Sequence, residues 1–263
     1  MEFYPEDCCK ELAKTFESID EIKNAMMKNE IIEGKVLLCD REHNLHIDLG
    51  AIRGIIQREE GALGIDDGTV RDIALISKVG KNVCFNIIGF QRDVFGNTCA
   101  VLSRKNVQKR CKEEFLDNLE LGDIIDAKVT HLEKFGAFID IGAGINALIP
   151  IDMLSVSRIS HPSDRFKGGQ SIFAVVSGRD EGGRICLSHK ELLGTWEENA
   201  AGFAPGETVA GTIRSVEDYG VFVELTPNLA GLAEPCPTLR PGDAASVYIK
   251  SLIPEKMKIK LII

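Results

Sequence analysis

Two stretches of the chain place a pair of aromatic residues where a β-strand would turn them away from a core. The first, residues 128–142, reads KVTHLEKFGAFIDIG. Its alternation predicts a half-buried strand with Phe138 among the outward Gly and Asp residues, and Phe135 lies in the turn just before it. Paired rings on a polar sheet face can stack on unpaired nucleobases, and each stacked base contributes about 1–3 kcal/mol. This stretch therefore predicts a single-stranded nucleic-acid interface.

The pattern of ring, Gly, apolar residue and ring occurs a second time. Residues 212–225, TIRSVEDYGVFVEL, place Phe222 outward and Tyr219 in the preceding turn. A weaker third copy lies at 34–50, GKVLLCDREHNLHIDLG, where His46 occupies the ring position of the strand. The recurrence predicts three repeats, two of which carry the full ring pair.

The cations beside these rings are the candidates for phosphate contacts. They are Lys128, Lys134 and Arg214. Two alternatives remain open at this point. All four rings could pack against a neighbouring repeat instead of stacking on bases, because the alternation says only that Phe138 and Phe222 lie outside their own barrels. Solvent exposure is also the common state of any surface Lys or Arg.

The elements that must position these rings are short strands. Five strand-like pieces per repeat, with one crossing between the third and the fourth, are typical of the OB barrel, whose second and third strands bind oligonucleotides. We expect a mainly β fold of three tandem five-stranded OB-fold barrels with a short helical N-terminal segment. The expected domains are the N-terminal helical segment at 1–30, a degenerate first repeat with a linker helix at 31–119, a second repeat at 120–203 and a shortened third repeat at 204–263.

The N-terminal segment has helical spacing of its apolar residues. Pro5, Glu6 and Asp7 suit a helix start. Ser18 followed by Glu21 reads as a capping box, which predicts two short helices that are broken near Ser18. Their apolar stripe must pack either on the first repeat, which is favoured, or on a partner protein.

The net charge of −9 limits the expected strength of RNA binding. Binding through phosphate neutralisation favours basic proteins, and none of the four expected domains carries more Lys and Arg than Asp and Glu. We therefore expect binding that is weak or salt-sensitive and that depends on the cations beside the rings.

Several other classes of protein are disfavoured. No apolar run reaches the about 18 residues of a membrane span, and the first residues lack the pattern of a secretory signal, so a cytoplasmic protein is expected. The 8 cysteines include no CxxC pair and no His at ligand spacing, which favours reduced, mostly buried thiols over disulfides or a metal site. No metal and no cofactor is expected.

An enzyme is the alternative class of protein. Gly142, Gly144 and Ala147 fit the spacing of a dinucleotide fingerprint and follow a predicted strand. The apolar residues after them do not open a helix, so a tight hairpin is favoured. The sequence contains neither a phosphate loop of the G-x-x-x-x-G-K type nor an HExxH motif. A protein without catalytic activity is therefore expected.

The motifs together resemble the S-one repeat, the RNA-binding OB domain of the bacterial ribosomal small-subunit protein one. The residues that carry the resemblance are KVTHLEKFGAFIDIG...NALIP, GTIRSVEDYGVFVEL...AGLAE, and HPSDRFKGGQ...GRDEGGRICLSHKEL followed by TW. The resemblance covers nearly all of residues 31–263 and is most specific in the second repeat.

The resemblance implies roles for particular positions. In the family, the turn ring and the strand-two ring stack on bases, and the matching residues here are Phe135, Phe138, Tyr219 and Phe222. An Asp and an Arg beside the last hairpin complete the family's surface, and Asp180 and Arg184 match them in the second repeat. In the third repeat only the positive charge is kept, at Lys258.

The chain also departs from the family's pattern. Pro150 and Glu234 stand where the family often has a His, which weakens the polar part of both sites. The first repeat has Gln57 and Cys99 at the corresponding polar positions and lacks both rings. In the family, degenerate leading repeats of this kind serve protein contacts at the ribosome.

The function expected from the residues and the resemblance is binding of single-stranded RNA, most directly messenger RNA, in association with the small ribosomal subunit and translation. No contact with a membrane is expected. The alternative is an adaptor whose N-terminal segment and first repeat dock on a ribosomal or RNA-processing protein. An RNA binder should lose affinity with salt and on removal of Phe138, whereas an adaptor should ignore RNA and bind its partner through residues 1–119.

Overall fold

The computed structural model describes residues 3–93, 95–157 and 159–263. The chain divides into two compact units. The first comprises residues 1–130, 138–147 and 169–185, and the second comprises residues 131–137, 148–168 and 186–263. The N-terminal segment and the first five strands lie in the first unit, and the last five strands lie in the second.

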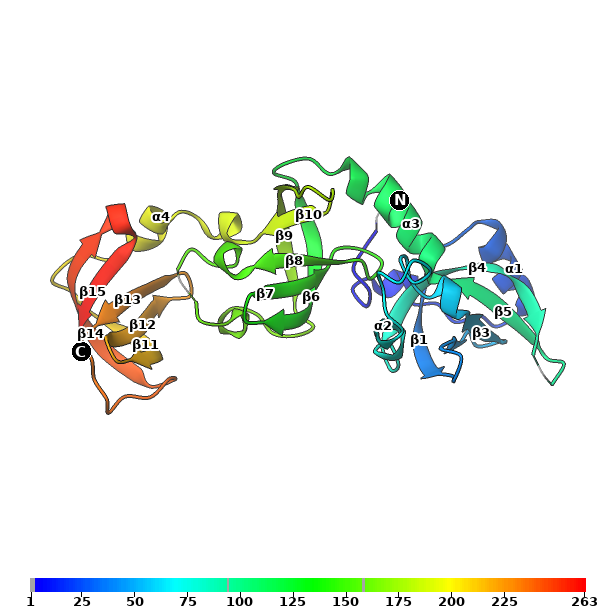
Figure 1. The fold of residues 1–263 in the computed structure, drawn as a ribbon, viewed down its shortest axis with the longest axis horizontal. Helices are drawn as coiled ribbons and strands as arrows, with labels where there is room; N and C mark the ends of the chain where they lie inside the picture. Colours follow the sequence, from blue (N-terminus) through cyan, green and yellow to red (C-terminus); the bar gives the residue numbers. More distant parts are fainter. Residues whose placement is uncertain (1–2, 94, 158) are drawn as a thin grey trace. The chain divides into compact units, whose positions relative to one another are not determined.

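The strands of the described residues form three groups of five in chain order (Figure 1). Their bounds are β1 Ile32–Cys39, β2 Leu45–Asp48, β3 Arg53–Ile56, β4 Asn82–Arg92, β5 Thr98–Ser103, β6 Ile124–Glu133, β7 Gly136–Asp140, β8 Asn146–Pro150, β9 Ser171–Arg179, β10 Ile185–Ser188, β11 Thr208–Glu217, β12 Gly220–Thr226, β13 Leu229–Ala233, β14 Ala244–Ile253 and β15 Lys258–Ile262.

Two of the groups close into barrels. Their orders, β1-β2-β3-β5-β4 and β11-β12-β13-β15-β14, match strand for strand, and each barrel includes one parallel pair, β3 with β5 and β13 with β15. The middle group is a five-stranded sheet, β10-β9-β6-β7-β8, with the same succession of neighbours read from a different strand. The expected mainly β fold of OB repeats is confirmed.

Short helices connect the strands. The α-helices are α1 Ile19–Met27, α2 Ile73–Ile76, α3 Arg104–Glu114 and α4 Trp196–Ala200. The 3-10 helices are η1 Lys10–Leu12, η2 Arg58–Glu60, η3 Leu116–Asn118, η4 Ile151–Met153, η5 Pro162–Asp164, η6 Lys190–Leu193 and η7 Pro254–Lys256. The expected linker helix at 106–119 is found as α3 followed by η3.

The predicted inward faces of the strands form the cores. In each repeat the alternating apolar residues of the second strand are almost completely buried, because the barrel or sheet closes over that side of the pleat. These residues are Leu45, Ile47 and Leu49 in the first repeat, Ala137, Ile139 and Ile141 in the second, and Val221 and Val223 in the third. The residues between them lie on the outside, which fixes the side of each sheet that the ring positions occupy.

The N-terminal segment packs on the first barrel, as expected. Phe16 and Ile22 are buried in the core of that barrel, and the backbone of Phe16 is hydrogen-bonded to Leu49 and Ala51 over 2.7 and 2.8 Å. Ile19, the first residue of α1, was expected to pack with them but is 37% exposed.

The predicted helix start at Pro5 is wrong. Glu6 and Asp7 form a turn, and the backbone N–H of Glu6 bonds to a distant carboxylate rather than entering a helix. The capping prediction is half right. The Ser18 hydroxyl accepts a hydrogen bond from the Glu21 N–H over 3.3 Å, but the Glu21 carboxylate accepts from the N–H of Glu17 rather than Ser18.

The cysteine prediction needs one correction. All 8 cysteines are free thiols. Only Cys84, Cys99 and Cys111 are buried, however, while Cys8 is exposed and the other four are intermediate. The expectation of mostly buried thiols is therefore wrong, since most of these thiols lie at the edges of the cores rather than inside them.

Candidate nucleic-acid interface

The ring pair of the third repeat stands on the outer side of β11 and β12. Phe222 lies opposite Ser215 of β11 and Leu232 of β13, so its side chain leaves the sheet away from the buried Val221 and Val223. The rings of Tyr219 and Phe222 meet edge to face, with centroids 6.1 Å apart and planes at 85°. Tyr219 is 67% exposed, so its ring offers a free π-face to a base.

Glycine is required between the two rings for a steric reason. A Cβ on Gly220 would lie 2.6 Å from the carbonyl oxygen of Ala233, and one on Gly136 would lie 2.4 Å from that of Ile149. A side chain does not fit at either place. The ring, Gly, apolar and ring pattern therefore combines an outward aromatic pair with the close approach of the next strand.

A pocket of about 660 Å³ lies beside the third-repeat rings within the second unit. One wall is the crossing segment of the second repeat between Ile151 and Arg165, and the other is the outer side of β11, β12 and β13 with Tyr219 and Phe222. This wall could not be predicted from the sequence, because the crossing was expected only to connect two strands of its own repeat.

An ion cluster forms one end of the pocket. The Glu224 carboxylate accepts from the Arg165 guanidinium over 3.4 Å and from the Arg214 guanidinium. Arg214 also donates to the carbonyl oxygen of Asp164 over 3.2 Å. Arg214 was expected to meet a phosphate, and the structure instead commits its side chain to these two acids.

Arg165 is bound even more completely. Its guanidinium also donates to the hydroxyls of Ser155 and Ser157, over 3.1 and 2.9 Å, and its side chain is only 8% exposed. Burial lowers the pKa of Arg165, and burial together with the charge of Arg165 lowers that of Arg214. The two guanidiniums crowd one another, and Glu224 holds them together.

The rings of the second repeat are placed as predicted relative to their own strand. Phe135 in the turn is 55% exposed, and Phe138 on β7 is half-buried. Lys134, in the same turn, is exposed. The Phe135 carbonyl accepts a hydrogen bond from the Ile151 N–H over 2.9 Å, which fixes the turn that carries this ring.

Asp180 and Arg184 shape the hairpin between β9 and β10. The Asp180 carboxylate accepts from the N–H groups of Gly182 and Arg184 over 2.9 and 2.8 Å, and from the Arg184 guanidinium over 2.9 Å. The bond from the Arg184 N–H is the main cause that lowers the pKa of Asp180. The Arg184 side chain is 86% exposed, and Lys258 at the start of β15 is also exposed.

The N-terminal segment covers part of the outer side of the second sheet. Lys128 on β6 and Asp140 on β7 were both expected to face solvent. The Lys128 ammonium instead donates to the carbonyl oxygens of Glu6 and Asp7 over 3.2 and 3.3 Å, and pairs with the Asp7 carboxylate over 3.1 Å. Lys128 is therefore not a freely exposed phosphate ligand in this structure.

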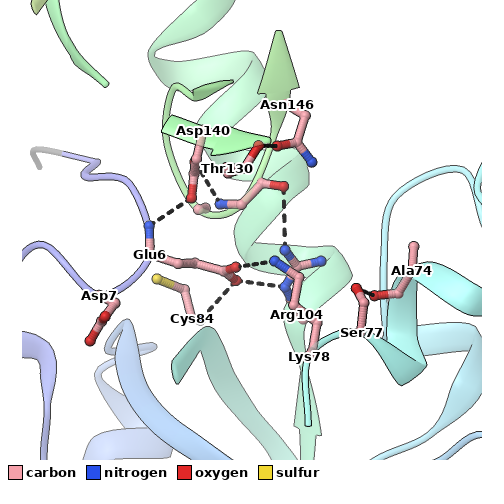
Figure 2. Close-up of polar contacts among 12 residues, drawn as sticks. Glu6, Asp7, Ala74, Ser77, Lys78, Cys84, Arg104, Thr130, Asp140 and Asn146 are labelled. Atoms are coloured by element: carbon pink, nitrogen blue, oxygen red, sulfur yellow. Dashed lines mark hydrogen bonds and ion pairs between the residues drawn. The ribbon is translucent and has the colours of Figure 1, made fainter. Parts of the chain in front are cut away.

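Glu6 lies at the centre of this contact (Figure 2). Its backbone N–H donates to the Asp140 carboxylate over 2.8 Å, and its own carboxylate accepts from Arg104 over 2.7 Å and from Lys78 over 2.6 Å. The Arg104 guanidinium also donates to the Gly144 carbonyl over 3.3 Å. Glu6 and Arg104 are only 5% and 3% exposed, so the group is sealed from water.

Burial and charge set the titration of both acids. Burial alone would raise the pKa of Glu6, but the charges of Arg104 and Lys78 and their hydrogen bonds lower it to about 2. Burial and the neighbouring Glu6 charge raise the pKa of Asp140 to about 6, against the N–H donors of Gly142 and Glu6. The contact therefore contains one firmly ionised acid and one that titrates near neutrality.

The glycines of the apparent dinucleotide fingerprint belong to this contact. The Asp140 carboxylate accepts from the N–H groups of Gly142 and Gly144 over 2.9 and 3.0 Å, and the hairpin closes through a bond from the Ile145 N–H to the Gly142 carbonyl. The prediction of a tight hairpin between two strands is confirmed. A Cβ on Gly144 would collide with the Arg104 guanidinium at 1.8 Å.

In the described part of the first repeat, the strand position that matches Phe138 and Phe222 carries His46 instead of a phenyl ring. His46, at the ring position, is bonded to the Asp40 carboxylate over 3.1 Å, and Cys99 is buried. Among the described residues, no group of three or more His, Cys, Asp or Glu side chains could hold a metal ion. No helix in the described part of the chain is long and apolar enough to cross a membrane.

Comparisons with known proteins agree with this geometry. The model of the S1 RNA binding domain family matches residues 118–190. The small ribosomal subunit protein bS1 homolog of Bacillus subtilis is 33% identical over 229 residues, which cover 85% of this chain and 54% of that protein. The small ribosomal subunit protein bS1 of Staphylococcus aureus is 29% identical over 94% of this chain and 65% of its own length.

A multidomain protein with nucleic acid binding domains from Streptococcus pneumoniae has a solved structure that covers 89% of this chain at 14% identity, with a TM-score of 0.24. The relatives from Bacillus and Staphylococcus are longer, and the chain spans 54% and 65% of their lengths.

Proposed function

Because this chain belongs to the bS1 family of S1-repeat proteins of the small ribosomal subunit, we propose that it binds single-stranded RNA during translation. The bound strand is most directly messenger RNA, and the partner is the small ribosomal subunit in the cytoplasm. The proposed role is binding alone, without catalysis or a cofactor.

The observation that carries this proposal is the outward ring pair of the third repeat. Tyr219 and Phe222 meet edge to face beside a pocket large enough for a nucleotide unit. Phe135 and Phe138 occupy the matching sequence positions in the second repeat, where the match to the S1 domain lies. Stacking tolerates any base, so affinity comes mainly from the rings.

Charge limits the affinity. The chain carries a net charge of −9, and Arg214 and Lys128 are engaged with acids of the protein itself. Exposed cations of the second and third repeats include Lys134, Lys258 and Arg184, and the Arg184 guanidinium also pairs with Asp180. Few phosphate contacts predict weak binding that salt opposes.

The test is fluorescence anisotropy of a short labelled single-stranded RNA titrated with the full chain at low and moderate salt. The double variant Phe138→Ala, Phe222→Ala should lose about tenfold or more, since each stacked base contributes about 1–3 kcal/mol. Phe95→Ala is the matched control, because Phe95 is a ring of the first repeat that is 85% exposed. Equal affinity of the parent and the double variant would refute stacking on these rings.

A second candidate function rests on the first repeat. Leu37, Ile73 and Phe95 are exposed by 55%, 66% and 85%, which is unusual for large apolar side chains. We infer an adaptor role for this repeat if RNA binding fails. The apolar stripe of the N-terminal segment is largely used inside the chain, so a docking surface would lie on the barrel. Capture of a small-subunit protein by the full chain, lost in Leu37→Ser with Ile73→Ser, would support this role.

A further inference from the structure

The pocket beside the third-repeat rings has a charge balance that does not suit phosphate. Two guanidiniums, from Arg165 and Arg214, face into it, and both are paired with carboxylates. Four carboxylates line the same space, from Asp152, Asp164, Glu217 and Glu224. Among the lining residues that the structure describes, the charged side chains therefore sum to a negative charge, which opposes a phosphate inside the pocket.

The acids are not equally available to a ligand. Glu224 is held by the two guanidiniums, and the Asp164 carboxylate accepts from the N–H groups of Ser160 and His161 over 3.1 and 3.3 Å. Asp152 and Glu217 are the exposed acids of the lining. Glu217 ends β11 opposite Gly220, on the same hairpin as both rings, so its carboxylate stands at the edge of the stacking surface.

A carboxylate at the edge of a stacked base accepts hydrogen bonds from the base. Guanine presents two neighbouring donors, N1–H and the N2 amino group, which match the two oxygens of one carboxylate. Uracil has one ring N–H donor, and adenine and cytosine each have one amino group on that edge. A carboxylate that contacts the Watson–Crick edge of a base therefore favours the base with the most hydrogen-bond donors on that edge, and this base is guanine.

We propose that the pocket between the second-repeat crossing and the third-repeat rings takes a guanine base of the bound RNA. The base stacks on Phe222 and Tyr219 and donates its N1–H and N2 amino hydrogens to the carboxylate of Glu217 or Asp152. This inference rests on the proposed RNA binding and adds to it. The third repeat then gives the protein a preference at one nucleotide, where stacking alone gives none.

The structure favours a base over the other ligand that an acidic aromatic pocket suits. A Lys or Arg side chain of a partner protein would also find carboxylates and ring faces here. The two rings, however, recur at matching positions in the second repeat, and Glu133 stands there at the position of Glu217. Asp152 and Asp164, from the crossing segment, are the acids that the pocket adds to this shared pattern. A ring pair with an acid at its edge is therefore common to both repeats, which suits a base that is both stacked and hydrogen-bonded.

The test compares four labelled oligomers that differ in one nucleotide. A short oligouridine is titrated with the full chain by fluorescence anisotropy, together with the same oligomer carrying one central guanosine, adenosine or cytidine. We expect the guanosine oligomer to bind roughly five- to a hundredfold more tightly than oligouridine, the range of one good bidentate base contact. Four equal affinities would overturn the inference and leave the proposed RNA binding intact.

Two conservative variants locate the contact. Glu217→Gln and Asp152→Asn each keep the shape of the pocket and remove one negative charge, and the guanosine preference should disappear in one of them while oligouridine binds at least as well. Glu255→Gln is the matched control, because Glu255 is an exposed acid of the third repeat outside the pocket lining. A guanosine preference that survives in both pocket variants would place the selectivity elsewhere and overturn the inference.

A crosslink gives a readout that does not depend on affinity. An oligomer with one central 6-thioguanosine is irradiated on the parent chain, and the modified peptide is identified by mass spectrometry. Adducts within 151–165 or 214–224 are expected, and adducts confined to other peptides would refute the pocket. If no oligomer binds and a labelled oligoarginine peptide binds in a way that Glu217→Gln abolishes, the pocket is a protein-docking site, and both this inference and the RNA proposal fail.

Discussion

The carboxylates of Glu6 and Glu224 each hold two cationic side chains, yet they belong to different kinds of site. Glu6 is 5% exposed and lies with Arg104 and Lys78 inside the first unit, where it holds the N-terminal segment in place. Glu224 is 15% exposed and lies with Arg165 and Arg214 at the end of a pocket. The same grouping of one acid and two bases therefore serves a sealed contact in one region and the wall of a binding site in the other.

The difference shows how burial decides what a cation can do. Arg104 has almost no exposed surface, so no phosphate can reach it, and its role is confined to the protein's own contacts. Arg214 keeps 29% of its side-chain surface and would meet a ligand if its acid were removed. Cations cannot be assigned to RNA from their nearness to a ring in the sequence without knowing which acids already hold them.

The largest expected effect comes from removing the sealed acid. Glu6→Gln leaves the charge of Arg104 buried without its partner, and we expect the free energy of unfolding of the first unit to fall by ~3–5 kcal/mol. Hydrogen exchange of peptides from the first barrel measures this loss. Glu224→Gln is the comparison, and it should cost the second unit clearly less, because its arginines retain other acceptors and some water. Equal losses would show that burial does not distinguish the two clusters.

The next effect is a pH dependence of stability, which we expect from the buried cluster around Glu6 and Asp140 and not from the cluster around Glu224. The pKa of Asp140 is raised from 3.8 to about 6, so the folded chain binds more protons than the unfolded chain between these values, and stability should fall as pH rises from about 4 to about 6. Glu6 acts oppositely and only at lower pH, because its pKa is lowered from 4.5 to about 2 and its contribution is lost as pH falls through that range.

Unfolding in urea at a series of pH values measures the Asp140 contribution. We expect a change on the order of 1–3 kcal/mol across the window. Asp140→Asn should remove this pH dependence, and Asp126→Asn, an exposed residue of β6, should leave it as it is. A slope that persists in Asp140→Asn would assign it to another group.

A smaller effect is expected on RNA binding when Glu224 is removed from the cluster that it forms with Arg165 and Arg214. Glu224→Gln removes the acid that holds Arg214, whose side chain is partly exposed, so affinity for a single-stranded RNA should rise several-fold at low salt, and the salt slope should steepen by about one. Glu6→Gln should leave both quantities unchanged if the first unit stays folded. Anisotropy titrations over a salt series measure the two variants side by side.

The smallest effect compares two lysines of the second repeat. Lys134 is exposed beside Phe135, whereas the Lys128 side chain is 17% exposed and bonded to Asp7. Lys134→Gln should weaken RNA binding by a factor of about two to five, as expected for one exposed phosphate contact. Lys128→Gln should leave RNA binding as it is and loosen the N-terminal segment. The reverse result would mean that the segment leaves β6 when RNA binds.

The sequence was sufficient to predict features that depend on the alternation of apolar and polar residues within one strand. The alternation around Phe138 and Phe222 predicted which side of each strand is buried, and five strands with one crossing predicted the OB layout, because both follow from residues close together in the chain. The glycine after each turn ring could also be recognised, although its steric cause became clear only from the neighbouring strand.

The two ion clusters could not be predicted in this way. The partners of Glu6 lie 72, 98 and 134 residues away, at Lys78, Arg104 and Asp140, and no pattern of spacing connects them. The pocket of the third repeat likewise takes one wall from the crossing of the second. A sequence pattern predicts which side of one strand or helix is buried. These sites form where segments that are far apart in the sequence come together, so no such pattern predicts them.

The hydrogen bond between Glu6 and Asp140 also constrains the order in which the chain folds during its synthesis. It joins positions 134 residues apart, so during synthesis the N-terminal segment cannot reach its final place until the hairpin after β7 has emerged. During that interval Glu6, Arg104 and Lys78 are exposed to water beside the first barrel. Long-range contacts of this kind slow folding. The nascent chain thus passes through a stage in which its first domain is built but its first residues are still loose.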